Sequence, residues 1–503
     1  MSFKYPLLLM FLLSCTAIRA QKQHDSLTYQ VEVATTIVPK GTAPLWLVSN
    51  RHGLSTLDDA SGYARFGVTQ SPMRIANSEK WNIGYGVDVV FPINHTSVCA
   101  DGSKQRTHFL IQQCHVDVDY QWMRLSVGAK ERPMALKNQR LSSGSQTFGI
   151  NARPVPDVRF EIPEYVSLTG KENPWIAIKG HFGYGMMTDG QWKKSHVART
   201  KKYNERTLLH SKAGYLKIGN PERFPLVFEG GLEMAAQFGG VKVTGNKREK
   251  MPQGVKDFME VIFGLGSDAS DGNFPNAAGN TLGSWLFSLT YQAKDWSARA
   301  YYDHYFDDHS MLFFQYGWYD GLLGLEINMP TNKWVSSVVY EYIKTTYQGG
   351  PVYHDHTAQI PDQISGMDNY YNHGSFPGWQ HWGQAIGNPL YTSPLYSANG
   401  SLGFRSNRFT AHHLGIEGAP ITGLNYRLLL SYATHLGTYG SPYLSPKYMT
   451  SGLAELNYNF AHIHALRNKG WFATIALGVD RGQQLGNNIG FSFSLKKAGL
   501  LLK

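Results

Sequence analysis

The segment from Trp285 to Phe306 constrains the fold more than any other part of this chain, because apolar and polar side chains alternate along it. A period of two places alternate side chains on opposite faces of a β-strand. The segment therefore predicts a β-hairpin that turns at Lys294 and Asp295 and has one apolar and one polar face. The apolar face comprises Trp285, Phe287, Leu289, Tyr291, Ala293, Trp296, Ala298, Ala300 and Tyr302.

Strands with two such faces recur along most of the chain, with tyrosine and tryptophan near their ends and acidic residues on their polar faces. The clearest segments are Trp81–Phe91, Val116–Trp122, Leu226–Phe238, Trp471–Val479 and Ile489–Leu495, and their polar positions include Asp88, Asp117, Asp119 and Glu229. A soluble β-sandwich also alternates in this way. The number of strands, the aromatic ends and the carboxylates favour a transmembrane barrel with a hydrated lumen, because a closed barrel pairs every backbone group in lipid.

The N-terminal residues predict a cleaved signal peptide, residues 1–20. Lys4 precedes a short apolar run, and an Ala-x-Ala site ending at Ala20 leaves Gln21 as the first mature residue. A lipoprotein site at Cys15 is the alternative, although Leu13 before Ser14 fits it poorly. No later segment has the roughly 18 to 20 consecutive apolar residues of a transmembrane helix. Composition changes little after the signal, so residues 21–503 are interpreted as one all-β, antiparallel barrel domain in the outer membrane, with long extracellular loops.

The chain is basic, with a formal net charge of +10, and removal of Lys4 and Arg19 with the signal lowers this to +8. Such an excess suits an acidic partner such as an anionic polysaccharide or the phosphates of lipopolysaccharide, and it also fits an ordinary basic exterior. The chain contains no dense lysine and arginine run and no nucleic-acid motif, so we expect no nucleic-acid partner.

Two cysteines, Cys99 and Cys114, remain in the mature chain and flank a polar stretch. In an oxidising compartment, two cysteines that bound one loop predict a disulfide across the tip of a hairpin. The pair offers too few ligands for structural zinc.

The longest irregular stretch, residues 345–412, contains a candidate sugar-binding loop. Aromatic faces can stack on a pyranose ring, while amides and a carboxylate can bind its hydroxyl groups. The alternative is that these aromatics fold the loop onto itself or onto the barrel mouth. The candidate residues are Asp368, Asn369, Tyr370, Tyr371, Trp379 and Trp382.

No other group of residues in the sequence predicts a catalytic site, a cofactor site or a metal site. Asp117 and Asp119 fit the lining of a lumen better than a pair of glycosidase carboxylates. The acidic loop Asp268–Asn273 lacks the spacing of an EF-hand calcium site, and the histidines of the long loop fit no ligand pattern. Serine hydrolase, P-loop and zincin motifs do not occur. Helical spacing over Val255–Phe263 predicts one short packing helix.

Several short motifs, in order across nearly the whole mature chain, resemble the capsule assembly protein family Wzi in its Bacteroidetes form. The motifs are Pro44-Leu45-Trp46-Leu47 with Asn50 and Gly53-Leu54; Asn151-Ala152-Arg153-Pro154-Val155-Pro156 with Ile162-Pro163-Glu164-Tyr165; Leu209-His210 with Lys212; and Asp368-Asn369-Tyr370-Tyr371-Asn372, followed by Gly378-Trp379 and Ile386-Gly387-Asn388-Pro389-Leu390.

The resemblance implies an outer-membrane barrel of about eighteen strands that binds capsular polysaccharide at the cell surface as a lectin and not as an enzyme. Two features depart from the family. The N-terminal segment before Pro44 is too short for the helical bundle that the enterobacterial members carry. Residues Lys496–Lys503 follow the last predicted strand, whereas outer-membrane barrels tend to end on an aromatic residue. We expect a monomer whose partners are surface polysaccharide and outer-membrane lipid. A porin or substrate-specific channel, and an outer-membrane hydrolase of glycan or lipid, remain the alternatives.

Overall fold

The computed structural model describes residues 26–502, apart from residues 76–77, 100–101, 171–173, 199, 264–265, 268–275, 278, 308–311, 313–317, 350–367, 398–399, 464–465 and 467–468. The predicted signal peptide, the acidic loop Asp268–Asn273 and the histidines at positions 354 and 356 lie outside the described residues. Among the described residues, no helix is long and apolar enough to cross a membrane.

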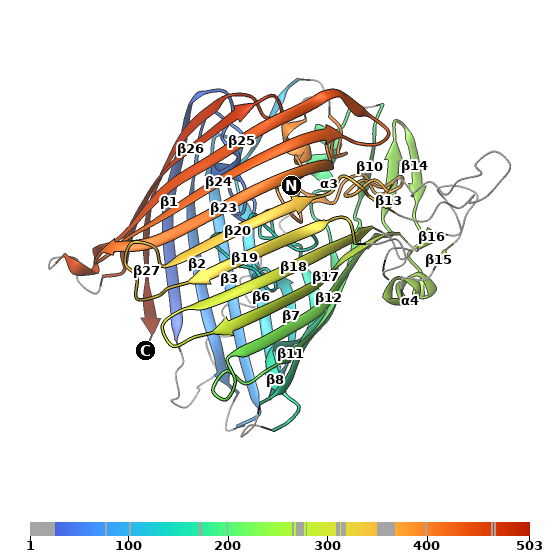
Figure 1. The fold of residues 1–503 in the computed structure, drawn as a ribbon. Coiled ribbons are helices and arrows are strands. Elements are labelled where there is room, and N and C mark those ends of the chain that lie inside the picture. The colour runs from blue at the N-terminus through green and yellow to red at the C-terminus, as the bar shows by residue number, and fades with distance from the viewer. Residues whose placement is uncertain are drawn as a thin grey trace.

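Eighteen antiparallel strands form one closed barrel (Figure 1), which confirms the predicted fold class. The first and last strands close it, with Val33 paired to Leu495. The strands in their order around the barrel are β1 (Leu27–Lys40), β2 (Ala60–Arg74), β3 (Trp81–Ile93), β6 (Leu110–Tyr120), β7 (Met123–Ala129), β8 (Asp157–Ser167), β9 (Ile176–Met186), β11 (Leu208–Ile218), β12 (Leu226–Phe238), β17 (Asn280–Gln292), β18 (Ser297–Asp307), β19 (Gly321–Asn328), β20 (Ser337–Lys344), β23 (Arg408–Ile421), β24 (Leu424–Gly437), β25 (Pro442–Asn459), β26 (Trp471–Gly482) and β27 (Asn488–Leu502).

The two predicted faces of the strands become the lipid side and the lumen side of the wall. Phe287 pairs with Tyr302 on the outer side of the β17–β18 hairpin, and Ala293 and Trp296 bracket its turn. The acids predicted on polar faces turn inward, where Arg65 binds Asp88 and Lys130 Nζ lies 2.5 Å from Asp117 Oδ2. The lumen tolerates Asp88 and Asp117 because each of these two carboxylates has a cationic partner.

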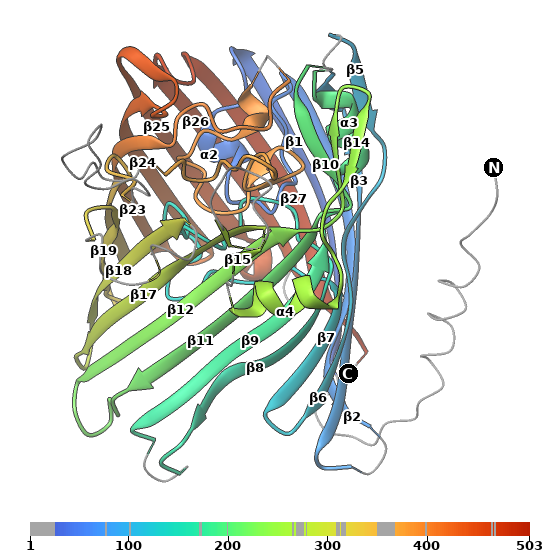
Figure 2. The ribbon, with the colours of Figure 1, turned by 90° about the vertical axis from the view of Figure 1, so that its right-hand side faces the viewer.

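The two ends of the barrel differ in the length of their connections. The chain crosses the end near Leu27 and Leu502 in tight turns, such as Ala293–Trp296, and places its long loops at the other end (Figure 2). Outer-membrane barrels have short periplasmic turns and longer extracellular loops, which assigns the long-loop end to the cell exterior. The elements outside the wall sheet are β4 (His95–Val98), β5 (Lys104–Thr107), β10 (Lys202–Glu205), β13 (Val241–Thr244), β14 (Lys247–Lys250), β15 (Gly266–Ser267), β16 (Asn276–Ala277), β21 (Gln380–His381), β22 (Gln384–Ala385), helices α2 (Leu45–Val48), α3 (Gly190–His196) and α4 (Val255–Phe263), and 3-10 turns η3 (Pro394–Tyr396) and η4 (Phe460–His462).

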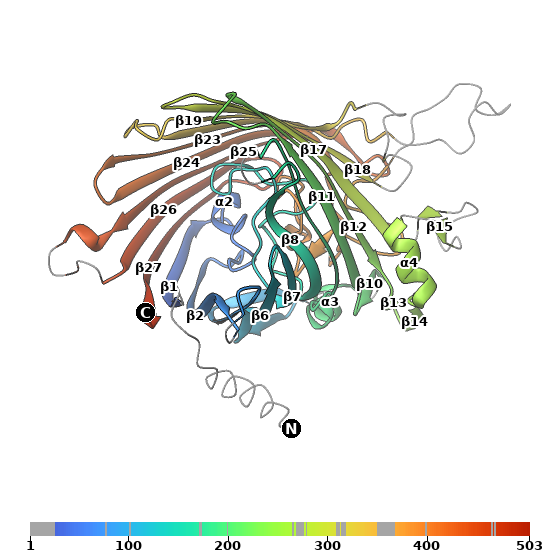
Figure 3. The same cartoon turned by 90° about the horizontal axis from the view of Figure 1, so that it is seen from below.

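Three exterior loops fold back into the lumen and form a plug, which we define as residues 41–59, 130–156 and 368–407. Seen from the short-turn end, α2 and the loop chains lie inside the ring of strands (Figure 3). The plug joins the wall in one apolar cluster in which Trp46, Leu141 and Trp379 pack with wall residues such as Tyr305 and Phe409. The plug therefore closes the lumen with a packed apolar layer.

Polar contacts fix the plug at several points around the wall. The carboxylate of Glu341 on β20 accepts hydrogen bonds from Ser142 Oγ at 2.6 Å and from the backbone amide of Ser143 at 2.8 Å. On β26, Asp480 accepts from the backbone amide of Leu45 at 3.0 Å. Because these bonds are buried, they hold the loops in one arrangement relative to the strands.

The structure corrects two expectations about the ends and cysteines of the chain. Strand β27 runs to Leu502, so the residues after Lys496 continue the closing strand instead of forming a tail. Both cysteines are free, and the predicted disulfide between Cys99 and Cys114 is wrong. Cys114 pairs with Val87 inside the barrel wall, whereas Cys99 lies beyond the end of β4. At about 3.3 Å per strand residue this separates them by on the order of 30 Å, far beyond the Cα distance of about 7 Å that a disulfide tolerates.

Candidate functional site

Three of the six predicted sugar-binding residues lie in the core of the plug. Tyr370, Tyr371 and Trp379 have at most 1% of their surface exposed. The Tyr371 ring stacks on Tyr391 with centroids 3.9 Å apart, and the indole Nε1 of Trp379 donates to the backbone oxygen of Thr147 at 2.9 Å. These aromatic rings are covered on both faces, so in this conformation they organise the plug and do not present a stacking surface.

The other three predicted residues lie nearer the exterior. Asn369 is exposed and Asp368 is half-buried beside it. Trp382, also half-buried, lies under the guanidinium of Arg153, whose Cζ is 4.5 Å from the ring centroid. The structure therefore divides the predicted site: Asn369 and Trp382 reach two different pockets, and the aromatic residues between them support the loop.

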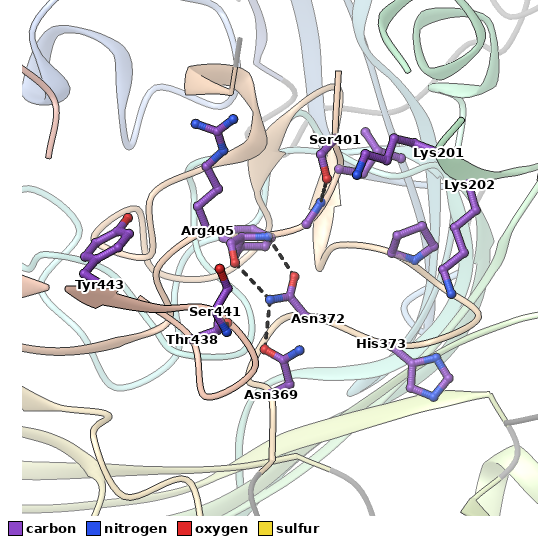
Figure 4. Close-up of a pocket in the computed structure, with 14 residues that line it drawn as sticks. Lys201, Lys202, Asn369, Asn372, His373, Ser401, Arg405, Thr438, Ser441 and Tyr443 are labelled. Carbon is purple, nitrogen blue, oxygen red and sulfur yellow. Dashed lines mark hydrogen bonds between the residues drawn. The ribbon is translucent and has the colours of Figure 1, made fainter. Parts of the chain in front are cut away.

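The larger of these pockets, which we call the mouth pocket, opens at the long-loop end and has a volume of about 470 Å³ (Figure 4). It forms where the loop between β9 and β11, the plug segment 368–407 and the β24–β25 turn meet. Its lining residues are Lys201, Lys202, Asn369, Asn372, His373, Pro377, Ser401, Leu402, Gly403, Phe404, Arg405, Thr438, Ser441 and Tyr443.

Asparagine side chains hold the floor of the mouth pocket in place. Asn372 Oδ1 accepts from the backbone amide of Phe404 at 2.7 Å, and its Nδ2 donates to the Phe404 oxygen and to Asn369 Oδ1, each at 3.0 Å. Asn369 Oδ1 also accepts from Asn407 Nδ2 at 2.6 Å. These bonds orient the Asn369 amide so that its NH₂ group remains for a ligand, because both bonds use the oxygen.

The charge of the mouth pocket has one sign. Lys201, Lys202 and Arg405 line it, and none of its lining residues is acidic. Among the described residues, no carboxylate lies within 4.0 Å of these three cations in an ion pair. Arg405 is exposed at the rim, where a guanidinium can bind a carboxylate or phosphate through two parallel hydrogen bonds. The pocket is thus suited to an anionic ligand that carries polar groups.

A smaller polar pocket lies beside Trp382 and Arg153 and also includes His95, His381 and Gln384. His95 Nε2 is 3.3 Å from Arg153 Nη2. Burial, together with the charge of Arg153, lowers the pKa of His95 to about 3, so its imidazole is neutral at physiological pH. Burial also lowers the pKa of Arg153 to about 10, which leaves the guanidinium charged. The pocket therefore places one cation against an indole face.

A second large cavity lies under the plug, between residues 130–155 and the inner wall, with a volume of about 430 Å³. Its charges largely neutralise one another: Asp157 binds Arg132 at 3.1 Å and Arg159 at 3.0 Å, and Lys130 binds Asp117. The mouth pocket differs because its cations have no such partners among the described residues.

Sequence reasoning missed the cations of the mouth pocket. Lys201 and Lys202 form a doublet that was visible in the sequence, whereas Arg405 and Tyr443 carry no local motif. Nothing in the sequence indicates that these positions converge, because the loops that bring them together are separated by long stretches of chain. Of the six predicted binding residues, Asn369 alone lines the mouth pocket, and Asn372 appeared only in a motif that resembles the Wzi family.

The fold and the position of the site define the class: this is an outer-membrane β-barrel protein with a plugged lumen. Neither a family model nor a curated protein sequence matches the chain. Among solved structures, it is similar to Wzi of Escherichia coli, an outer-membrane protein involved in group 1 capsule assembly that is described as a carbohydrate-binding β-barrel, with a TM-score of 0.54, 12% identity, and coverage of 97% of this chain and 87% of that chain.

Porin-like barrels of Pseudomonas aeruginosa are also similar in outline. OccK5 (OpdH) aligns over 96% of this chain and 100% of its own with 8% identity and a TM-score of 0.49, and OccD3 (OpdP) over 96% and 93% with 9% identity and a TM-score of 0.45. At these identities the similarities to Wzi and to the Occ proteins concern the fold alone.

Proposed function

We propose that this protein binds an acidic surface polysaccharide at the mouth pocket and thereby helps to attach or organise a capsule, as a lectin and not as an enzyme. The observation that carries the proposal is the set of three cations, without an acidic neighbour in the lining, on a floor fixed by the plug. The carbohydrate binding stated for Wzi, whose fold this chain shares, supports the same conclusion.

Binding would be non-covalent and would combine charge with polar recognition. Lys201, Lys202 and Arg405 attract carboxylate or phosphate groups on the glycan. The Asn369 amide donates to a ring hydroxyl or a carboxylate, and the half-buried Tyr443 ring offers a face for a pyranose. The exposed part of the half-buried Trp382 ring provides a second contact for a neighbouring sugar residue of a long chain. The pocket behind it has a volume of about 20 Å³, which holds about one water molecule and no sugar ring. The buried residues Tyr370, Tyr371 and Trp379 contribute indirectly, since they hold the loop that carries Asn369; Asp368 lies beside this contact.

The decisive experiment compares removal of the charges of the pocket with removal of the same number of charges at the opposite end. The triple variant K201A/K202A/R405A is compared with K80A/R223A/K333A, in which three exposed cations at the short turns are removed. Exposed charge pairs contribute roughly 0.2 to 1 kcal/mol each, so we expect the first variant to bind polygalacturonate about tenfold more weakly. Its binding should also lose most of its salt dependence, while the second variant and all binding to neutral dextran stay unchanged. Wild-type affinity for polygalacturonate in the first variant would refute the proposal.

A channel function makes a different prediction for the same protein. The plug fills the lumen with the apolar cluster and buried hydrogen bonds described above, which leaves little room for ion flow through the described residues. We expect low conductance in planar bilayers for the wild type. Steady, porin-sized conductance would favour the channel alternative, and release of sugar or fatty-acid products from purified glycan or lipopolysaccharide would favour the hydrolase.

A further inference from the structure

Helix α4 lies outside the barrel, against the outer face of β9, β11 and β12 near their exterior ends (Figures 1 and 2). Its inner side packs on the wall: the rings of Phe258 and Tyr184 have centroids 5.0 Å apart, and Val261 is buried against Phe238 and Ala236. The helix confirms the element predicted over Val255–Phe263, and its position at the wall is the new observation.

The backbone of α4 satisfies two polar groups that point outward from the wall. Tyr184 Oη donates to the Phe258 oxygen at 2.8 Å, and Lys212 Nζ donates to the Ile262 oxygen. A lysine on the lipid face of a barrel wall is costly unless it is covered or reaches water. Since α4 covers Lys212 and the buried His210 beside it, the helix replaces this part of the lipid-facing surface.

The outer side of α4 presents an apolar stripe. Val255, Met259 and Phe263 follow one another at intervals of four residues and are 84%, 50% and 59% exposed. The stripe continues the lipid-facing surface of the same strands, where Phe182 and Met186 are also exposed. Side chains of this kind, in line with a surface that contacts acyl chains, are suited to lipid.

Basic residues lie directly before the helix. All four residues of β14 are exposed, and they include Lys247 and Lys250. Lys256 in the first turn of α4 is also exposed, and its Nζ lies 3.4 Å from Glu260 Oε1. Arg248 of the same strand is bound to Glu205 at 2.6 Å, which neutralises it. Among the described residues, Lys247 and Lys250 take part in no ion pair. An apolar stripe with such lysines beside it is the arrangement of a helix that lies in a membrane interface and contacts phosphate groups.

We propose that α4 and β14 form a lipid-binding edge on the outside of the barrel. In this arrangement, α4 lies in the plane of the outer leaflet with Val255, Met259 and Phe263 among acyl chains. Lys247 and Lys250 bind the phosphate groups of the lipids around it. At α4 this role is separate from the polysaccharide site, because the helix lies on the lipid side of the wall. Strand β14 belongs to the same small sheet as β10, which carries Lys202 of the mouth pocket.

Nitroxide scanning tests the position of the helix. In a C99S/C114S background, single cysteines at positions 255, 256, 259, 260 and 263 are spin-labelled, and the protein is reconstituted in phosphatidylcholine and phosphatidylglycerol vesicles. We expect labels at 255, 259 and 263 to be accessible to oxygen and protected from a water-soluble nickel reagent, and the label at 256 to show the reverse. Equal access of the nickel reagent to all positions would overturn the proposal.

A charge reversal tests the contact with phosphate. The thermal midpoint of wild type should rise when phosphatidylglycerol is added to phosphatidylcholine vesicles, and K247E/K250E should lose most of that rise. The control L444S, which removes an exposed leucine from another strand, should keep it. An equal rise in the charge-reversed variant, or a rise in detergent with inorganic phosphate alone, would contradict a lipid surface as the partner. The variant M259S/F263S, which removes most of the apolar stripe and leaves the charges of β14 in place, should reduce the rise and keep wild-type polygalacturonate binding, so failure of this proposal is distinguishable from failure of the polysaccharide site.

Discussion

Lys137 Nζ lies 3.2 Å from Asp303 Oδ2 inside the barrel, and both side chains are almost completely shielded from solvent. Lys137 belongs to the plug and Asp303 to strand β18 of the wall. The backbone amide of Gln146, also in the plug, donates to the same Asp303 oxygen at 3.1 Å. The pair therefore couples the position of the plug to the integrity of the wall.

Substitution K137M should destabilise the protein strongly. It leaves the Asp303 carboxylate buried without its cation, and breaking a buried ion pair in this way costs roughly 3 to 5 kcal/mol. We expect a lower thermal midpoint and faster proteolysis of residues 130–156. The double variant K137M/D303N removes both charges and should recover most of the loss; a double variant as unstable as K137M would show that the pair itself is not the cause.

Two tryptophans of the predicted site should respond differently to alanine. Trp379 is fully buried, so W379A should cost roughly 3 to 5 kcal/mol of stability and loosen the plug. Trp382 is half-buried against Arg153, so W382A should leave the thermal midpoint nearly unchanged and weaken polysaccharide binding by on the order of 1 kcal/mol. Thermal unfolding and polygalacturonate titration of both variants provide the test. A W382A variant that unfolds as readily as W379A would assign Trp382 to the plug core.

Acidification should loosen the β4–β5 hairpin. Burial and Arg153 lower the folded pKa of His95 to about 3, whereas the unfolded value is near 6.5. Between these values only the unfolded state binds the proton, so stability is fully present above about pH 6.5 and falls as the pH drops toward 3. At pH 5.5 the loss is about 1.4 kcal/mol. Hydrogen exchange of residues 95–107, corrected for intrinsic rates, should accelerate at pH 5.5 in wild type and change less in H95Q. Equal acceleration in both proteins would exclude His95 as the cause.

The free cysteines predict a simple chemical result. Denatured protein taken from the envelope without reductant should add two maleimide groups, one each at Cys99 and Cys114. The double variant C99S/C114S should keep the wild-type thermal midpoint, because no cross-link is lost. If the protein adds no maleimide before reduction and two maleimide groups after reduction, the prediction of a disulfide is correct.

The wall was predictable because its signal is local. In the β17–β18 hairpin, alternation alone identified both faces and the turn, since each side chain takes its side from the pleat of its own strand. The same rule explains the failures. The residues before Pro44 were interpreted as a short N-terminal segment and not as strand β1. The residues after Lys496 were interpreted as a tail, because the adjacent pair Lys496–Lys497 obscures the alternation of β27 that its pairing with β1 reveals.

The candidate site was predictable only in part, because its position depends on tertiary packing. Aromatic residues suit both a sugar platform and a protein core, and composition does not distinguish Tyr371 in the core from Tyr443 at the pocket. The polar contacts of the plug, such as Ser142 with Glu341, decide which side chains remain outside. The convergence of Lys202 and Arg405 follows from that arrangement and from no local pattern.

The seam between β1 and β27 has a consequence for biogenesis. Residues Leu27–Ile37 pair with the segment from Phe491 to Leu502, so the two ends of the chain meet in one ladder. Closure cannot occur until the final strand has been synthesised and exported, and until then β1 offers an open edge for pairing. An escort that shields this edge in the periplasm would protect the nascent protein from wrong pairing. Loss of the whole final strand would leave the barrel with an open slit.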